Sequence, residues 1–510
     1  MVLRQTGKAE YIKKNISDQL DQRPWQEVET EHCRFHDKRH RDRFSIVLRI
    51  RGDRIGETIP MACENKAQVK GTYRFFDGDN NGVTEFNILS GHFHATGARI
   101  SAEKEQVYIA HDTTEFDFKS NRAPSDEAGK KPARKVKVDG TFQGYTQFSI
   151  LMHSACVVTR KGLYLGMAGA QFFTRAKFKG VAALLRDDES PTRLRPNSPE
   201  SARWEDVLRQ ACEVAGDPSR CVHIADREGD IYDFIDAAFK LGTNFLIRIQ
   251  HDRSTGDGDI AISDEMELAG VRGVRRIHVK DRDGNDDVAK LDIRARRVCI
   301  NPPKPKRKHF EPLTVTVVYA EERGTPKNRD RIVWKLMTNL PVQSRDDAIE
   351  RLDCYALRWK IEVFHKAAKS GCNTEKSKLQ TAQRLTNFIA TNCVVAWRVC
   401  HMTMLKRARP DARPEEVLTT EEIEMLDKHV PDKRGCSTKK TLSDYIRKIA
   451  ILGGYLARKN DGPPGNIVMR RGMNLLMIIC AVERGPIKGS QDTGGNGVLA
   501  GGGRRSKRCG

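Results

Sequence analysis

The sequence predicts an α/β protein, and three observations support that fold class. Apolar runs of strand length alternate with helical patterns between about residues 105 and 250, as expected of an α/β core. Residues 253–332 break the alternation, because they are rich in Asp, Gly, Arg and Pro and contain β-branched runs, so they predict a β-rich insertion. Helical patterns fill the chain before about residue 75 and from about residue 344 to 482.

The elements of the core follow from local patterns. The runs "EQVYIAHDTTEFDF", "YTQFSILMHSACVV" and "KGLYLGMAGAQFF" predict strands separated by turn signals. "SPESARWEDVLRQACEVAG" predicts a helix, "CVHIADREGDIYDFIDAAFKLG" a strand, a polar turn and a helix closed by Gly242, and "NFLIRIQ" another strand. "SRDDAIERLDCYALRWKIEVFHKAAKSG" predicts one long helix with Ser344 as its N-cap and Gly371 as its stop.

These patterns divide the 510 residues into four segments. Residues 1–85 predict a helical N-terminal domain, and residues 86–400 predict the α/β core with its insertion. Residues 401–482 predict a helical C-terminal domain. Residues 483–510 form a Gly-rich, basic tail whose composition is typical of disorder.

The balance of charge favours a polyanionic partner. The net charge is +21, and such an excess of Lys and Arg most often serves nucleic-acid binding, with a merely basic protein as the alternative. The N-terminus has no apolar signal region, and the longest apolar run, "LLMIICAV", is far too short to span a bilayer. The 13 cysteines contain no C-x-x-C pair, which fits reduced thiols and a cytoplasmic location.

One segment aligns an unusual set of side chains. On a helix, Tyr355, Arg358, Glu362, Lys366 and Lys369 fall within a stripe of roughly 80°. One carboxylate among a phenol and three bases indicates a site that holds phosphates. The ordinary alternative makes the acid a partner of the base four residues later on the helix.

Two more carboxylates follow apolar strands. Asp112 comes after "VYIAH", where the strand is expected to open onto a turn, and Asp226 comes after "CVHIA". Ligands gather at strand ends in α/β sheets, so these acids and Glu362 could converge. Such an oxygen-rich site suits Mg²⁺, and two such ions can serve displacement at a phosphodiester. Taken singly, each Asp is more ordinarily a turn former or cap, and Glu228 and Asp230 compete with Asp226.

A second candidate cluster lies near the N-terminus. "HCRFHDKRH" places His32, Cys33, His36 and His40 close together in sequence. A zinc site would need four convergent ligands. The arginines around the cluster favour a helix that contacts phosphates instead.

Four ordered motifs resemble those of bacterial cut-and-paste insertion-sequence transposases that excise through a DNA hairpin. The spacing Tyr355-x2-Arg358-x3-Glu362-x6-Lys369 resembles their Tyr-Arg-Glu-Lys signature. "HDTTEFDF" and "IADREGDIYDF" resemble their two catalytic Asp motifs, and "KGTYRFFD" resembles part of their N-terminal DNA-binding domain. The resemblance covers roughly residues 25–480.

The resemblance implies a ribonuclease-H-like catalytic core with a β-rich insertion, flanked by helical N-terminal and C-terminal domains. It implies that Asp112, Asp226 and Glu362 are the catalytic metal ligands. The implied cofactor is Mg²⁺, for which Mn²⁺ substitutes.

The resemblance also implies a set of residues that contact DNA. Trp334 matches a tryptophan that stacks on a base flipped out of the helix during hairpin formation, and an aromatic face offsets roughly 1–3 kcal/mol of lost stacking. The others are implied to lie beside the DNA end or to bind its phosphates. They are Tyr355, Arg358, Lys366, Lys369, Arg248, Arg39 and Arg43.

The expected function is that of a transposase that binds the inverted-repeat ends of its own element as a homodimer and inserts the element into target DNA. A non-transposing nuclease with the same core and an inactive end-binding inhibitor are the alternatives. The sequence departs from the family near the C-terminus, where tryptophans are usual and this chain has "GNIVMRRGMNLLM" with Asn466. That region is implicated in dimer formation in the family.

Overall fold

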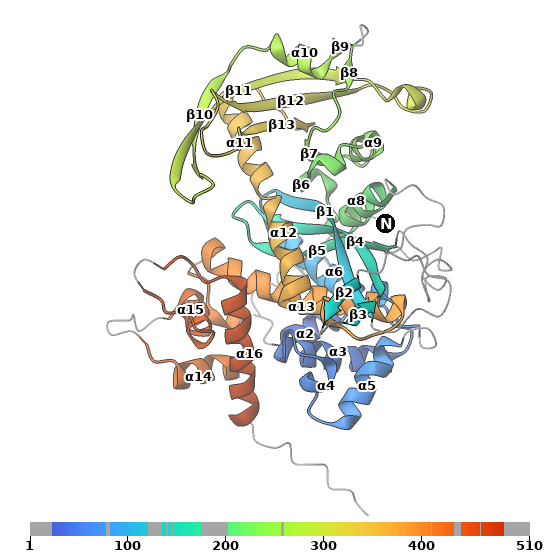
Figure 1. Cartoon of the computed structure of the whole chain (residues 1–510), viewed down its shortest axis with the longest axis vertical. Helices are drawn as coiled ribbons and strands as arrows, with labels where there is room; N and C mark the ends of the chain where they lie inside the picture. The colour runs from blue at the N-terminus through green and yellow to red at the C-terminus, as the bar shows by residue number, and fades with distance from the viewer. Residues whose placement is uncertain are drawn as a thin grey trace, which may run out of the picture.

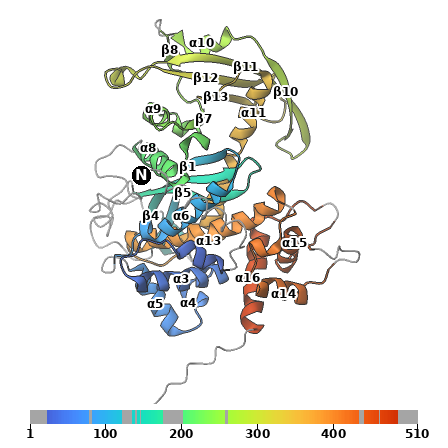
Figure 2. The ribbon, with the colours of Figure 1, turned by 180° about the vertical axis from the view of Figure 1, so that it is seen from behind.

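The structure, a computed structural model, has three parts along its long axis (Figure 1). A β-rich lobe lies at one end, the α/β core in the middle and helices from both ends of the chain at the other end (Figure 2). Apart from Glu483, the tail expected to be disordered lies outside the described residues. The structure describes residues 23–77, 82–120, 135–138, 141–144, 146–174, 202–256, 260–409, 411–432, 440–458 and 461–483.

One mixed sheet of eleven strands runs through the core and the lobe, in the order β5-β4-β1-β6-β7-β13-β12-β11-β8-β9, with β10 paired to β11. Strands β1, β6 and β7 are parallel, whereas β4 and β5 are antiparallel to their neighbours. The core strands are β1 (Val107–Ser120), β4 (Thr146–Thr159), β5 (Tyr164–Phe173), β6 (Cys221–Ala225) and β7 (Asn244–Arg248). The lobe strands are β8 (Ser254–Thr255), β9 (Ile260–Ala261), β10 (Gly273–Lys280), β11 (Asp286–Ile300), β12 (Leu313–Glu322) and β13 (Val333–Thr338). A separate hairpin pairs β2 (Lys135–Val138) with β3 (Thr141–Gly144).

The residues predicted as a β-rich insertion contain β8 to β12 and the short helix α10 (Ile262–Glu267). They do not form a sheet of their own. Strand β13 pairs with β12 on one side and with β7 on the other, so it joins the lobe to the core sheet. The lobe is therefore fixed to the core by backbone hydrogen bonds rather than by a linker alone.

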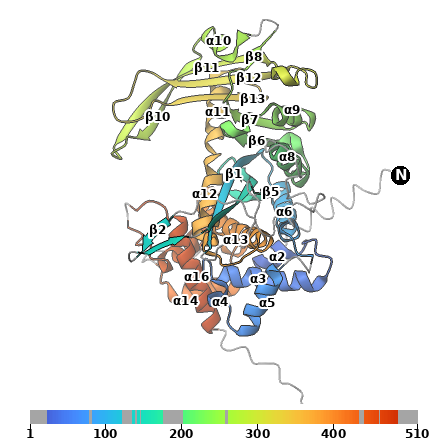
Figure 3. The same cartoon turned by 45° about the vertical axis from the view of Figure 1, so that its right-hand side comes forward.

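Helices cover both faces of the core sheet and form the end opposite the lobe. Helices α8 (Ala202–Ala215) and α9 (Tyr232–Lys240) pack on one face, and α12 (Trp359–Lys366) and α13 (Ala382–Ala408) lie on the other. Helix α11 (Arg345–Ala356) leads from the lobe into α12 (Figure 3). The remaining helices are α2 (Trp25–Thr30), α3 (Lys38–Asp53), α4 (Ile59–Ala62), α5 (Lys66–Phe76), α6 (Glu85–Ala102), α14 (Thr420–His429), α15 (Leu442–Leu452) and α16 (Asn466–Glu483).

Helix α13 is the central helix of the packed helices. Its segment Ala382–Leu405 has a mean hydropathy of 1.3, so length and composition alone would allow it to cross a membrane. However, 89% of the most apolar window is buried inside the protein. It packs against β5, α6, α3 and α16, which is the environment of a core helix.

The single long helix predicted over residues 344–371 is wrong in its continuity. Ser344 is the N-cap as predicted, since its side chain accepts a hydrogen bond from the Asp347 amide. Helix α11 ends at Ala356, however, and the next turn is closed by bonds to the third preceding residue, such as that from the Arg358 amide to the Tyr355 carbonyl. After α12 the chain forms a π-helical turn over Ala367–Gly371. The tighter turn at Arg358 and the wider turn after Lys366 change the rotation per residue, so the five side chains predicted to form one stripe do not lie along a single straight line.

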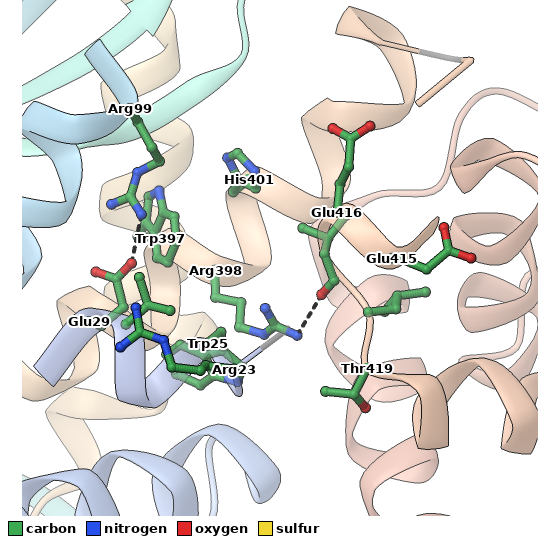
Figure 4. A pocket seen from close by; sticks show the side chains of 13 residues that line it. Arg23, Trp25, Glu29, Arg99, Trp397, Arg398, His401, Glu415, Glu416 and Thr419 are labelled. Carbon is green, nitrogen blue, oxygen red and sulfur yellow. Dashed lines mark hydrogen bonds and ion pairs between the residues drawn. The ribbon is translucent and has the colours of Figure 1, made fainter. Parts of the chain in front are cut away.

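A buried carboxylate fixes the N-terminal helices to the core. Glu29 of α2 is 1% exposed, and it bonds Arg99 Nη1 of α6 at 2.7 Å and His92 Nδ1 at 2.5 Å (Figure 4 shows the Arg99 pair). Burial would raise the pKa of Glu29, but the two partners outweigh it and lower the pKa to about 2. His92 is the neutral donor of this pair, because its other nitrogen accepts from the Met167 amide and burial lowers its pKa.

Two arginines stacked on tryptophans extend this contact around a pocket of 200 Å³. Arg99 lies 4.1 Å from the centre of the Trp397 ring, and Arg398 lies 4.9 Å from that of Trp25. Arg398 also donates to the Val417 carbonyl at 3.4 Å (Figure 4). Cation–π contacts therefore join α2 and α6 to α13, and the hydrogen bond of Arg398 joins α13 to the loop before α14.

We predict that Glu29→Gln lowers the free energy of unfolding by about 3 kcal/mol, because it leaves the guanidinium of Arg99, which is only 22% exposed, without its counter-charge. Urea unfolding at pH 7 measures the change. The control is Glu31→Gln, which removes a half-exposed ion pair with Arg23 and should cost about 1 kcal/mol or less. Since the pKa of Glu29 is lowered, its stabilisation is complete above about pH 4.5 and is lost as the pH falls towards 2. The difference between wild type and variant should shrink over that range, and a constant difference would contradict the assignment.

Candidate active site

The register of two parallel strands brings two carboxylates together. His111 of β1 pairs with Ala225, the last residue of β6. The next residue of each chain segment is an acid, Asp112 and Asp226, so both carboxylates stand at the same level of neighbouring strands. Burial raises the pKa of Asp112, and the neighbouring Asp226 raises it further.

Asp112 does not lie at the end of its strand, as the sequence suggested. Strand β1 continues to Ser120, and Asp112 pairs with Ser154 of the equally long β4. Strand β1 is long because β4 supplies ladder partners on one side after β6 has ended on the other. Asp226 does follow its strand as expected, and its side chain caps a short 3-10 turn by accepting from the Glu228 amide at 2.9 Å.

The two competitors of Asp226 have other surroundings. Asp230 is buried, accepts from the amides of Gln250 and His251 at 2.7 and 2.8 Å, and pairs with Arg253 at 2.8 Å. Glu228 has a side chain that is 60% exposed. Of these three acids, Asp226 is therefore the one that stands beside Asp112.

Helix α12 adds the third carboxylate. Glu362 Oε1 lies 2.5 Å from Arg358 Nη2, and Arg358 Nη1 lies 3.9 Å from Asp112 Oδ2. The ordinary alternative, in which Glu362 pairs with Lys366, is thus not what the structure shows. The guanidinium of Arg358 bridges the acid of the helix and the acid of the strand.

The surroundings of Asp112 disfavour its negative charge. Burial and the neighbouring Asp226 raise the pKa of Asp112 to about 7, although Arg358 and the amide of Thr113 act in the opposite direction. A carboxylate in such surroundings is stabilised by an added cation. Oxygen donors alone, from three acids, are the ligands that a hard divalent cation prefers.

His365 is a neighbour that the sequence did not single out as a site residue. Its Nε2 lies 3.0 Å from Ser154 Oγ, and its Nδ1 lies 3.8 Å from Asp112 Oδ2. Burial lowers its pKa to about 3, so the ring is neutral. Its position three residues after Glu362 on the same helix was the signal that could have identified it.

Two of the three acids, Asp112 and Glu362, and two of the bases face one open groove, which we call the catalytic groove. Asp112, Glu362, His365, Lys366 and Lys369 line it. Lys366 is exposed, and Lys369 is half-buried, with its ammonium 5.9 Å from the centre of the Phe116 ring. Two of the predicted phosphate-binding side chains therefore share a surface with two of the predicted catalytic acids.

Tyr355 lies behind this groove rather than in it. It is 7% exposed, and burial raises the pKa of its hydroxyl, while the nearby guanidinium groups of Arg358 and Arg248 act against that shift. Arg248 donates to the carbonyl of Val333 at 3.2 Å. The next residue, Trp334, is half-buried on β13, so it and Arg248 are close neighbours.

The structure places Arg39 and Arg43 elsewhere, on α3 among the N-terminal helices. Arg39 has a side chain that is 89% exposed and pairs with Asp37 at 2.6 Å. Arg43 is exposed, and its guanidinium lies against Gly71 of α5, where an added Cβ would stand 2.8 Å from Nη1. Both are available to a partner of this domain but not to the catalytic groove.

Within the described part of the chain, no group of three or more His, Cys, Asp or Glu side chains is already arranged to hold a metal ion. In "HCRFHDKRH" the ring of His32 lies 3.7 Å from that of His94, and the buried thiol of Cys33 faces the backbone carbonyls of Glu29 and Ile88. At the sheet edge, Arg358 lies between Asp112 and Glu362 instead.

Two family models match this chain, one over the N-terminal helices and one over most of the α/β core. Residues 22–81 match the description "Transposase DNA-binding", and these residues include α2 to α5 with Arg39 and Arg43. Residues 193–397 match "Transposase DDE domain" and include Asp226 and Glu362, whereas Asp112 precedes the matched range. The chain therefore joins a transposase DNA-binding segment to a DDE catalytic domain, and it is a DNA-binding DDE transposase, an enzyme of DNA cleavage and strand transfer.

Proposed function

We propose that Asp112, Asp226 and Glu362 are the catalytic triad of this transposase and hold Mg²⁺, with Mn²⁺ able to substitute. The observation that carries the proposal is the register of β1 and β6, which sets two of the acids side by side opposite the acid of α12. When bound, the metal activates the nucleophile and stabilises the leaving oxygen at phosphorus. The strand order β5-β4-β1-β6-β7, with β1, β6 and β7 parallel, supports the expected ribonuclease-H-like core.

The bases around the triad are proposed to position the DNA. Lys366 and Lys369 would hold phosphates in the catalytic groove, and Arg358, which lies between Asp112 and Glu362, would add a guanidinium that can bind a phosphate beside them. Tyr355 is buried, so it acts through Arg358 rather than on the DNA directly.

The proposed reaction proceeds through a hairpin on the transposon end. Water nicks one strand, the freed 3′-OH attacks the opposite strand, the hairpin is hydrolysed, and the 3′-OH is joined to target DNA. In each step the protein positions the DNA for in-line displacement at phosphorus and stabilises the charge that develops there. Trp334 beside Arg248 is proposed to stack on the base that leaves the helix.

The N-terminal helices are proposed to bind the inverted-repeat ends through Arg39 and Arg43, with two copies of the chain on paired ends, in the bacterial cytoplasm. The match to a transposase DNA-binding model supports the first part of this proposal. No observation favours the alternatives of a non-transposing nuclease or an inactive inhibitor.

We predict that Asp112→Asn, Asp226→Asn and Glu362→Gln each keep DNA binding and lose nicking, because an amide does not supply the charge that Mg²⁺ needs. Gel shifts and cleavage of end DNA, measured in parallel, test this. Glu228→Gln is the control, since that exposed acid lies two residues from Asp226 and should leave cleavage intact. Because the pKa of Asp112 is raised, Asp112→Asn should also stabilise the metal-free protein at pH 8. Retained cleavage in a triad variant removes that acid from the site.

We predict that affinity for end DNA falls steeply with salt, since Lys and Arg displace counterions from phosphates. Arg43→Ala should lower the slope of log K against log salt by about 0.9, the value for one lost contact. Lys240→Ala on α9 removes the same charge far from α3 and should leave the slope unchanged. A flat response of the wild type would refute the idea that the net charge serves DNA binding.

We predict that Trp334→Ala separates the reaction steps. First-strand nicking should survive, while hairpin formation or resolution slows by roughly ten- to a hundredfold, the equivalent of one lost stacking contact of about 1–3 kcal/mol. Denaturing gels of a labelled end resolve nicked, hairpin and final products over time. Trp334→Phe keeps an aromatic face and should lie between wild type and Trp334→Ala. If all products form at wild-type rates in Trp334→Ala, the residue has only a packing role.

A further inference from the structure

A second groove lies beside the catalytic groove, between α12, the end of α13 and the start of α16. Its volume is 540 Å³, and the described residues that line it include four basic side chains and no Asp or Glu. They are Lys360, Lys366, Arg407 and Arg470. We call it the basic groove.

The charges of the basic groove have no carboxylate partner among the described residues. Arg470 donates to the carbonyl of Gly371 at 2.7 Å, which satisfies a hydrogen bond but not a charge. The contrast is with the other C-terminal helices, where Lys440 and Lys448 share Asp427 and Asp432. Four like charges at one groove repel one another, so an anion between them is favourable.

Helix α16 adds further positive potential, because its first residue, Asn466, lines the basic groove. The free amides of the first turn and the positive end of the helix dipole point towards that end.

The two grooves meet on the exposed side of α12. Lys366 and Ser370 line both of them. A helix is about 10 Å wide, so a strand that rises roughly 3.4 Å per nucleotide passes from one groove to the other in about three nucleotides. A polyanionic strand therefore fits the continuous surface better than an isolated small anion does.

We infer that the basic groove binds the phosphate backbone of the DNA strand that leaves the catalytic groove, an inference that rests on the proposed transposase function. Lys360 and Arg407 provide the contacts specific to it, since Lys366 also serves the catalytic groove. The groove extends the DNA-binding surface from the triad across α12 to the C-terminal helices.

The test uses a double variant, Lys360→Ala with Arg407→Ala, and a matched control, Arg209→Ala with Lys240→Ala. Each removes two positive charges, and the control pair lies on α8 and α9 over the opposite face of the sheet. Fluorescence anisotropy of a labelled end duplex, over a salt series without divalent metal, gives the slope of log K. The slope should fall by about 1.8 in the double variant, at about 0.9 per contact, and not in the control.

The outcomes separate the two proposals. If the wild type shows no salt-dependent binding and no cleavage, the proposed function fails. If the wild type binds and cleaves but the double variant matches its control, the basic groove does not bind DNA. If the double variant fails to fold, the single variants Arg407→Glu and Arg407→Ala are compared instead. Arg407 is exposed, so both should fold, and the charge reversal should weaken DNA binding more than the removal of the charge does. Equal binding of these two single variants would also overturn the inference.

Discussion

The active edge of this protein depends on the register between β1 and β6. Because their parallel ladder ends at His111 and Ala225, two carboxylates must stand side by side, and burial prevents water from screening their repulsion. The basic side chains nearby, Arg358, Lys366 and Lys369, place positive charge beside these acids. Burial and Asp226 raise the pKa of Asp112, and Arg358 opposes that shift without cancelling it.

Two buried acids illustrate the difference between a structural and a reactive carboxylate. Glu29 has Arg99 and His92 within hydrogen-bond distance, so its pKa falls despite complete burial. Burial and a neighbouring acid raise the pKa of Asp112, and an arginine at 3.9 Å does not offset them. The first arrangement stabilises the join between the N-terminal helices and the core. The second leaves room for a cation, at a cost in stability that a bound metal ion would remove.

The break between α11 and α12 links the lobe, the triad and the DNA surface. Tyr355 ends up buried on α11, whereas Glu362 and Lys366 reach the surface from α12. The turn at Arg358 lets one guanidinium contact both the strand and the helix. The same helix then presents the catalytic groove on one side and the basic groove on the other, so its sequence serves chemistry, packing and DNA binding together.

The sequence by itself determined the local elements and the chemistry of individual residues. Apolar runs of strand length specify β1, β4 and β5, Ser344 caps α11, and the spacing of Arg358 and Glu362 brings them together within one helical turn. Only the tertiary structure decided that Asp112 sits inside a strand, because the length of β1 depends on its partner β4 rather than on its own residues. Likewise, the joining of the lobe to the core sheet and the meeting of α12 with α16 at the basic groove depend on pairings between segments far apart in the chain, which no local pattern encodes.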